Sequence, residues 1–233
     1  MSPIAFCAFP DRAALARSLA AHVAEALRAR CARDGRASLA VSGGRTPALF
    51  FDLLSGAPLD WSRICVTLVD ERWVPESEAR SNGALVRRHL FQGPAAAASF
   101  LPLYTGAATP EDGLAQAERE TGGLALPFAA VVLGMGDDGH TASFFPHADG
   151  LSAAIDPASP CRLAAVRADA AGEPRITFTL PPLLAADRVF LHIEGAGKRQ
   201  VLDAARADGA IEDMPVRAVL RNLGRPLDVF WCP

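Results

Sequence analysis

The fold that we expect for this chain is decided by the segment Phe128-Ala-Ala-Val-Val-Leu-Gly-Met-Gly-Asp-Asp-Gly-His-Thr-Ala-Ser-Phe-Phe-Pro146. Residues 128–133 form a continuous apolar run, which is typical of a parallel strand that is buried on both faces. Three glycines then interrupt the run, and glycine permits a tight turn that other atoms can approach closely. Ligands of open α/β sheets bind just beyond the carboxyl ends of the strands. The turn at 134–140 therefore predicts a functional site.

The side chains on this turn that can do chemistry are Asp137, Asp138 and His140. A carboxylate beside an imidazole holds one tautomer and stabilises the protonated ring. The glycines also match the dinucleotide pattern G-x-G-x-x-G, but two adjacent aspartates would repel a pyrophosphate. That pattern requires a helix directly after the glycines, where this chain has Phe144-Phe-Pro146. We favour a catalytic His140 over a dinucleotide site and over a histidine that only caps the turn.

The rest of the chain alternates short apolar runs with amphipathic segments. We expect a helix from Asp11 to about residue 33, a short helix over 84–91, a helix over 110–121, and polar or Gly/Pro-rich connections at 76–80, 93–109 and 147–161. The predicted strands are 4–9, 37–41, 64–69, 128–133, 162–166, 175–180, 189–193 and 228–231. This alternation indicates a doubly wound, mainly parallel α/β sheet with helices on both faces, in a single domain over residues 1–233.

A second strand end carries the motif Ser42-Gly-Gly-Arg-Thr-Pro47. We expect Thr46 to cap the following helix and Pro47 to be its first residue. A strand, a Gly-Gly turn and a helix start direct free N–H groups and the positive end of the helix dipole to one place. The motif lacks the spacing of an ATP-binding loop, so we favour a site for a single phosphate, with an ordinary turn as the alternative.

Two further strand ends carry charged residues. Asp70-Glu-Arg72 follows strand 64–69 and can pair a carboxylate with a guanidinium in a cleft, or simply form a solvated loop. Lys198 follows strand 189–193 and is the only lysine in the chain. Its compact ammonium suits a phosphate pocket, although an exposed helix position is equally compatible. The ends of strands 37–41, 64–69, 128–133 and 189–193 can therefore converge on one cleft.

The remaining four histidines carry no such context. His22 and His89 fall on predicted helices, His192 falls inside a strand, and His147 lies in a loop without an obvious partner. We expect His22 to be structural, His89 to be a surface or packing residue, and His192 to be a core residue with its hydrogen bonds satisfied. His140 is thus the histidine for which the sequence predicts chemistry.

Composition excludes several classes of protein. The net charge of −3 in 233 residues argues against a nucleic-acid partner, and no apolar run is long enough to cross a membrane. The first residues lack the pattern of a secretory signal. The five cysteines are scattered and include no Cys-x-x-Cys pair, so we expect neither a zinc site nor a disulfide framework. A cytoplasmic protein is the simplest interpretation.

Five motifs together closely resemble the 6-phosphogluconolactonase family, and they span nearly the whole chain. They are Ser42-Gly-Gly-Arg-Thr-Pro47, Asp70-Glu-Arg-Trp-Val-Pro75 with Ser81-Asn82, Leu133-Gly-Met-Gly-Asp-Asp-Gly-His-Thr-Ala-Ser-Phe-Phe-Pro146, Arg175-Ile-Thr-Phe-Thr-Leu180 and Gly197-Lys198. The resemblance implies a Rossmann-like fold similar to glucosamine-6-phosphate deaminase and ribose-5-phosphate isomerase. It also implies hydrolysis of 6-phosphogluconolactone to 6-phosphogluconate in the oxidative pentose phosphate pathway, with no metal or other cofactor.

The resemblance also implies roles for individual residues. His140 would be the general base that activates water, oriented by Asp138, with Asp70 and Arg72 beside the sugar ring. The implied phosphate and sugar contacts are Ser42, Gly43, Gly44, Thr46, Arg175 and Lys198. Arg45 stands where the motif often has a small polar residue, so no phosphate contact is assigned to it. We expect a monomer whose partner is a small sugar phosphate lactone.

Other functions have weaker support. The chain contains no Gly-x-Ser-x-Gly elbow and no His-Glu-x-x-His motif, which disfavours a serine nucleophile and a zinc hydrolase. Related deaminases resemble this chain but carry a glutamate shortly after Asp-Gly-His, and residues 141–149 contain none. A sugar-phosphate sensor of this fold would need an added DNA-binding segment, for which the domain leaves no room. A dehydrogenase remains the third alternative.

Overall fold

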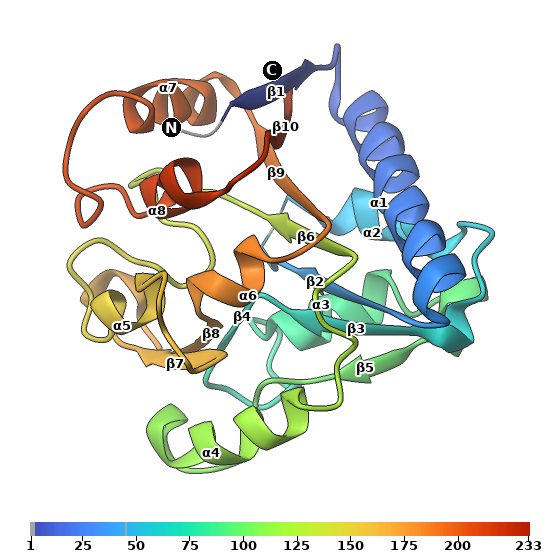
Figure 1. Cartoon of the computed structure of the whole chain (residues 1–233), viewed down its shortest axis with the longest axis horizontal. Helices are drawn as coiled ribbons and strands as arrows, with labels where there is room; N and C mark the ends of the chain where they lie inside the picture. Colours follow the sequence, from blue (N-terminus) through green and yellow to red (C-terminus); the bar gives the residue numbers. More distant parts are fainter. Residues whose placement is uncertain (1–2, 45) are drawn as a thin grey trace.

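A seven-stranded sheet forms the centre of the structure, a computed structural model that describes residues 3–44 and 46–233 (Figure 1). Its strands lie in the order β1-β10-β9-β6-β2-β3-β5, and every neighbouring pair is parallel. The strands are β1 (Ile4–Ala8), β2 (Ala37–Val41), β3 (Ile64–Leu68), β5 (Ser99–Leu101), β6 (Ala130–Leu133), β9 (Arg188–Glu194) and β10 (Leu227–Cys232). The predicted doubly wound, mainly parallel sheet is confirmed.

Helices pack on both faces of this sheet, as predicted. Helices α1 and α2 cover one face, while α7 and α8 lie on the other (Figure 1). The helices are α1 (Arg12–Asp34), α2 (Ala48–Ser55), α3 (Asn82–His89), α4 (Pro110–Thr121), α5 (Leu151–Ile155), α6 (Leu180–Leu184), α7 (Ala196–Ala205) and α8 (Val216–Asn222), with short 3-10 helices at Trp61–Arg63, Gly93–Ala97 and Asp169–Ala171. Within the described residues, none of these helices has the length and apolar character needed to cross a membrane.

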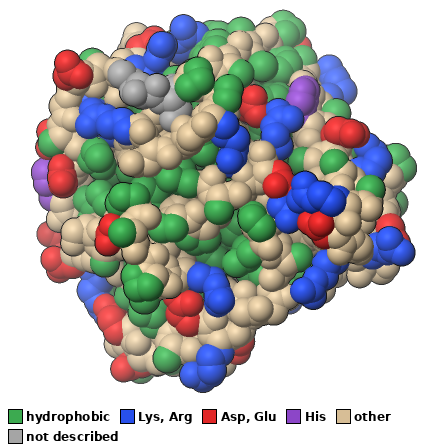
Figure 2. Space-filling model, viewed as in Figure 1, with side chains coloured by type: hydrophobic (Ala, Val, Ile, Leu, Met, Phe, Trp, Pro, Cys, Tyr) green, Lys and Arg blue, Asp and Glu red, His purple; other side chains and the backbone are tan. Residues whose placement is uncertain are grey.

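The middle strands of the sheet are buried because helices cover them on both sides. Every residue of β2 and of β6 is buried, which is why β6 is continuously apolar and β2 is apolar except at Ser38, instead of alternating. On the molecular surface, acidic and basic side chains are mixed over the face seen in Figure 2. The core therefore explains the apolar runs, and charge is confined largely to the outside.

A second, smaller sheet was not predicted. It contains β4 (Asp70–Arg72), β8 (Arg175–Phe178) and β7 (Leu163–Val166), paired antiparallel in the order β4-β8-β7. The Asp70–Arg72 segment, for which the sequence left a cleft or a solvated loop open, is therefore an ordered strand. Arg72 is the register partner of Arg175. Pairing over such a distance in sequence leaves no local pattern from which it could be predicted.

The starts of the first two helices show one case in which local sequence signals predict the cap correctly and one in which they do not. Asp11 caps α1 by accepting a hydrogen bond from the Ala14 N–H at 2.7 Å, and Gly35 ends the helix in a left-handed conformation, so the predicted limits of Asp11 and about residue 33 are confirmed. The predicted Thr46 cap of α2 is wrong. Pro47 occupies the cap position with φ −80° and ψ −5°, and its carbonyl accepts the first helical bond, from Phe51. Thr46 is consequently free to line the cavity described below.

Short elements inside the predicted connections were missed. The 147–161 segment contains α5, and the 93–109 segment contains a 3-10 helix and β5. Strand β5 exists because it pairs with β3, with Ser99 opposite Cys65. Elements of three to five residues show too little periodicity to be recognised without their tertiary partners.

Glu71 is a buried carboxylate that joins β4 to the start of α3. Its Oε1 accepts hydrogen bonds from the backbone N–H groups of Arg72 at 2.7 Å and Asn82 at 2.8 Å. Its Oε2 accepts from the Ser81 hydroxyl at 2.9 Å and the Gly83 N–H at 2.8 Å. Burial raises the pKa of Glu71 despite these hydrogen bonds, which act to lower it. The carboxylate thereby fixes Arg72 and Asn82 relative to each other.

Replacing Glu71 by Gln is expected to lower the free energy of unfolding by about 1–3 kcal/mol. The amide group would face two N–H or O–H donors and leave them without an acceptor. Urea unfolding measures the change. Glu25→Gln is the control, because Glu25 is exposed and pairs only with Arg28, and it should change stability by less than about 0.5 kcal/mol. Equal stability of Glu71→Gln and the wild type would contradict this role.

Candidate active site

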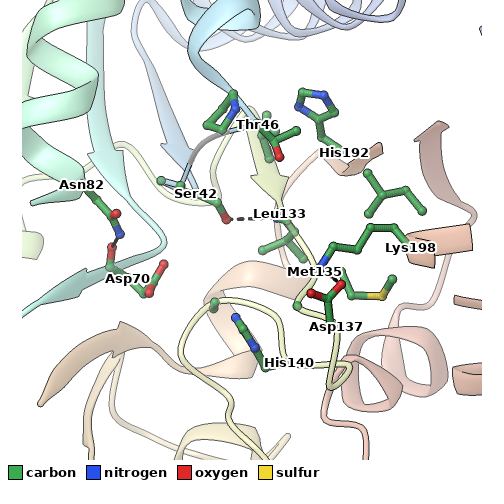
Figure 3. Close-up of a pocket in the computed structure, with 18 of the residues that line it drawn as sticks. Ser42, Thr46, Asp70, Asn82, Leu133, Met135, Asp137, His140, His192 and Lys198 are labelled. Carbon is green, nitrogen blue, oxygen red and sulfur yellow. Dashed lines mark hydrogen bonds and ion pairs between the residues drawn. The ribbon is translucent and has the colours of Figure 1, made fainter. Parts of the chain in front are cut away.

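A cavity of about 420 Å³ lies beyond the carboxyl ends of β2, β3, β6 and β9 (Figure 3). This volume is within the range of small-ligand sites. The cavity brings together all the sequence-predicted site residues except Asp138, which lies beside it: Ser42, Gly43, Gly44, Thr46, Asp70, Arg72, His140, Arg175 and Lys198. The four strand ends therefore converge as expected. Arg45 lies outside the described residues.

His140 and Asp138 form a hydrogen-bonded pair on the turn after β6. His140 Nδ1 lies 2.6 Å from Asp138 Oδ1, and the His140 backbone N–H donates to the same oxygen at 3.0 Å. Partial burial acts to raise the pKa of Asp138, but these hydrogen bonds outweigh it and lower that pKa to about 2. An ionised carboxylate requires a donor, so Nδ1 carries the hydrogen. The other nitrogen, Nε2, keeps the lone pair that can accept a proton.

The turn that carries this pair is held tightly. The Gly136 N–H donates to the His140 carbonyl at 2.8 Å, and the Thr141 hydroxyl donates to the Gly134 carbonyl at 2.8 Å. A Cβ atom at position 136 would lie 2.1 Å from His140 Nδ1 and 2.5 Å from Asp138 Oδ1. Glycine at 136 is therefore required for the ring and the carboxylate to occupy their positions.

The Ser42–Thr46 segment packs against two other strand ends. The Gly134 N–H donates to Ser42 Oγ at 3.1 Å, which connects the loops that follow β2 and β6. A Cβ atom at Gly43 would lie 1.9 Å from Asn82 Oδ1, so only glycine permits this approach. Gly44 is exposed and has φ +98°, a conformation that favours glycine. The two glycines thus serve different purposes, close packing at 43 and backbone conformation at 44.

Asp70, Arg72 and Asn82 form one polar network in the cavity wall. Arg72 Nη1 donates to Asn82 Oδ1 at 2.8 Å and to the Arg80 carbonyl at 2.7 Å. Asn82 Nδ2 donates to the Asp70 carbonyl at 2.9 Å. The buried Asp70 carboxylate accepts a 2.6 Å hydrogen bond from Ser143 Oγ. The bond to Arg80 also attaches the end of the 76–80 loop to this network.

Arg175 is a buried cation with an unused donor. Only 7% of the residue is exposed. Its Nη2 donates to the Ala171 carbonyl at 2.8 Å, whereas Nε has no hydrogen-bond partner among the described residues. Burial lowers the pKa of Arg175, but a guanidinium stays protonated in proteins. A buried cation with an unpaired N–H is costly, and it points to an anionic ligand.

Lys198, at the start of α7, is the second cation directed at the cavity. Its Nζ lies 2.7 Å from Asp137 Oδ1. The Lys198 side chain is 25% exposed, whereas the Asp137 side chain is 91% exposed. The alternative of a purely exposed helix position for Lys198 is therefore excluded, because the side chain lines the cavity.

Sequence reasoning missed other residues in the cavity wall. His192 was expected to be a core residue, and it is buried, but it also lines the cavity together with Glu194. Asn82 was considered only as part of a motif. Side chains alternate between the two faces of a strand, so residues 192 and 194 of β9 lie on the same face. This alternation could have predicted that His192 and Glu194 line the cavity together.

The other histidines lie outside the cavity. The Nδ1 atom of His22 is 2.8 Å from the Ser18 carbonyl, and that of His89 is 2.9 Å from Asp52 Oδ1. His147, for which no partner was foreseen, has Nε2 3.2 Å from Asp213 Oδ1. No group of three or more His, Cys, Asp and Glu side chains among the described residues could hold a metal ion.

The arrangement suits acid–base chemistry on an anion. It combines an imidazole whose free nitrogen is Nε2, two cations that can meet a phosphate, and backbone N–H groups on glycine turns. Figure 3 shows Thr46 and His140 at opposite ends of the cavity, with Lys198 between them. A ligand with an anionic group at one end can therefore be held by that group while its other end meets His140.

Comparison with known proteins identifies relatives over nearly the full chain. A family model described as glucosamine-6-phosphate isomerases/6-phosphogluconolactonase matches residues 10–231. The 6-phosphogluconolactonase of Rhizobium meliloti (strain 1021) is 50% identical over 225 residues, which are 97% of this chain and 97% of that protein. The family resemblance predicted from the motifs is confirmed.

Solved structures agree with this assignment. The crystal structure of a 6-phosphogluconolactonase from Shewanella baltica OS155 has a TM-score of 0.96 at 38% identity, covering 100% of this chain and 98% of the other. A monomeric glucosamine-6-phosphate deaminase has a TM-score of 0.75 at 16% identity, covering 100% and 97%, and shows the predicted likeness in fold. This chain belongs to the glucosamine-6-phosphate isomerase/6-phosphogluconolactonase family.

Proposed function

We propose that this chain hydrolyses 6-phospho-D-glucono-1,5-lactone to 6-phospho-D-gluconate, the second step of the oxidative pentose phosphate pathway. The observation that carries the proposal is the combination, in one cavity, of the carboxylate-held imidazole of His140 with the cations Arg175 and Lys198. The relatives from Rhizobium meliloti and Shewanella baltica, which match nearly all of this chain, are 6-phosphogluconolactonases.

The phosphate is proposed to bind between the Gly43-Gly44 turn, Thr46 and the two cations. Backbone N–H groups at a glycine turn before a helix attract anions. The Arg175 guanidinium, which lines the cavity, would supply positive charge to the phosphate, and Lys198 would exchange its bond to Asp137 for a phosphate oxygen. Ser42 supports this site by accepting the bond from Gly134.

His140 is proposed to act as the general base. Nε2 takes a proton from water as the water oxygen attacks the lactone carbonyl carbon, and ionised Asp138 stabilises the resulting imidazolium. The imidazolium then returns the proton to the ring oxygen as the C–O bond breaks, which leaves a carboxylic acid and a hydroxyl. The carboxylic acid ionises at neutral pH and releases one proton to solvent. Backbone N–H groups of the 134–139 turn or the Arg72 guanidinium would stabilise the intermediate oxyanion.

Asp70 and Arg72 are proposed to position the sugar ring. Both are already fixed, Asp70 by Ser143 and Arg72 by Asn82. Fixed polar groups hold a substrate in a reactive geometry at little further entropic cost. The distribution of charge in the wall thus separates a phosphate end from a reacting end.

The remaining expectations form part of the same proposal. We propose that residues 1–233 form one domain, because one continuous hydrophobic core includes residues of both sheets. All five cysteines are free thiols, which suits a reducing compartment such as the cytoplasm. We also propose that the protein is a monomer.

The function is tested by acid release from freshly prepared 6-phosphogluconolactone, with the spontaneous rate subtracted. We expect rapid hydrolysis by the purified protein, and the same rate after treatment with a chelator, because the proposed mechanism uses no metal. Absence of a rate above the spontaneous one would refute the function. Full loss of activity in chelator, restored by added zinc, would refute the metal-independent mechanism.

Lys198→Ala is expected to raise KM by about ten- to a hundredfold, because a charge-assisted contact to the phosphate is lost. Steady-state kinetics with the lactone measures the change. Arg199→Ala is the neighbouring control, since Arg199 pairs with Asp203 on the exposed side of α7 and should leave KM unchanged. A Lys198→Ala variant with wild-type KM and kcat would remove Lys198 from the phosphate site.

His140→Asn is expected to lower kcat by about 10²–10⁴-fold, the usual contribution of a general base. Asparagine keeps polarity and approximate size but cannot accept a proton at neutral pH, so binding of 6-phosphogluconate should persist. The wild-type rate should also fall in acid, because a protonated imidazole cannot act as a base. His22→Asn is the control outside the cavity. A folded His140→Asn variant with near wild-type kcat would contradict the assignment and make Asp70 the next candidate.

A further inference from the structure

His192 is a buried titratable group in the cavity wall that the proposed mechanism does not use. The residue is 4% exposed and lines the cavity from β9. Figure 3 places it near Thr46, with Lys198 between it and His140. His192 therefore lies at the end of the cavity where the phosphate is proposed to bind, and far from the reacting end.

Its partners determine where the hydrogen on the ring lies. His192 Nε2 is 3.2 Å from Glu194 Oε1, and Arg12 Nε donates to Glu194 Oε2 at 2.7 Å. Burial acts to raise the pKa of Glu194, but the hydrogen bonds from His192 and Arg12 outweigh it and lower that pKa. Ionised Glu194 requires a donor, so Nε2 carries the hydrogen. The second ring nitrogen, Nδ1, makes no hydrogen bond among the described residues.

The elements packed around the ring add no other fixed charge. Helix α2 contributes the Phe50 ring, edge-on at 6.4 Å between centroids, and β10 contributes Phe230 as the register partner. The charged groups among the described residues on this side of the cavity are Glu194 on the same strand, Arg12 on α1, Lys198 on α7, and Asp137 on the turn after β6.

A carboxylate in the wall of an anion site raises an electrostatic problem. Arg12 pairs with Glu194 Oε2, but Oε1, which contacts His192, would still repel an incoming phosphate unless positive charge lies between the two. A neutral His192 would also turn the lone pair of Nδ1 towards the phosphate oxygens. One added proton on Nδ1 solves both problems, because two flanking anions favour the charged form of an imidazole.

We propose that His192 is a further ligand of the substrate phosphate, and that it binds the phosphate as an imidazolium that bridges it to Glu194. This inference rests on the proposed function for the nature of the ligand. It makes phosphate binding a proton-linked step: the protein takes up a proton at His192 Nδ1 when the phosphate arrives and releases it when the product leaves.

Calorimetric titration with 6-phosphogluconate at pH 7, in buffers of different ionisation enthalpy, counts the protons taken up on binding. His192→Gln can still donate to Glu194 but cannot become a cation. We expect it to weaken binding by about ten- to a hundredfold and to take up fewer protons than the wild type. His89→Gln removes a similar histidine–carboxylate pair outside the cavity and should match the wild type in both.

Each other outcome overturns the inference. Unchanged affinity and proton uptake would remove His192 from the site, and weaker binding with full proton uptake would show a packing role only. Inorganic phosphate alone should give the same difference between variant and wild type. A difference seen only with 6-phosphogluconate would place the ring against the sugar.

If His192→Gln does not fold, the wild type still provides a test. Ring-nitrogen chemical shifts, recorded with and without inorganic phosphate, should show a buried histidine becoming doubly protonated, and the lack of such a change would overturn the inference. Binding is measured here without turnover. Failure of the wild type to hydrolyse the lactone would therefore refute the proposed function by a separate measurement.

Discussion

The parallel direction of the central strands is the constraint on which the rest of the structure depends. Because all seven strands point the same way, the loops that follow β2, β3, β6 and β9 meet at one edge of the sheet. Their approach is close enough that Gly43 has no room for a Cβ atom beside Asn82. Gly43 is thus a consequence of this convergence, whereas Gly136 is required by His140 and Asp138 on its own turn.

The antiparallel sheet contributes two arginine side chains to the cavity wall. It pairs β4 with β8, so that Arg72 and Arg175 face the same cavity from segments about a hundred residues apart. Glu71 then fixes the start of α3 to β4 through four hydrogen bonds. A site built in this way is preorganised, since its polar groups are held by buried backbone contacts instead of by flexible loops.

Charge is balanced inside the cavity before any ligand binds. Lys198 is paired with Asp137, and Glu194 is paired with Arg12 and also hydrogen-bonded to His192. A bound phosphate would therefore add a counter-charge for Arg175 and compete with Asp137 for Lys198. Competition of this kind moderates affinity, because part of the interaction with the ligand replaces an interaction already present in the protein. It suits a reaction whose product carries an additional negative charge and must leave.

The sequence by itself determined the parallel strands other than β5, the limits of α1 and α4, and the turn that carries His140, because each rests on local periodicity, capping or glycine chemistry. It also indicated which strand ends are polar, and the motifs indicated the family. Only the tertiary structure decided that β4 pairs with β8, that Pro47 and not Thr46 caps α2, and that His192 faces the cavity. These features arise from contacts between segments distant in sequence, and such contacts leave no local pattern in the chain.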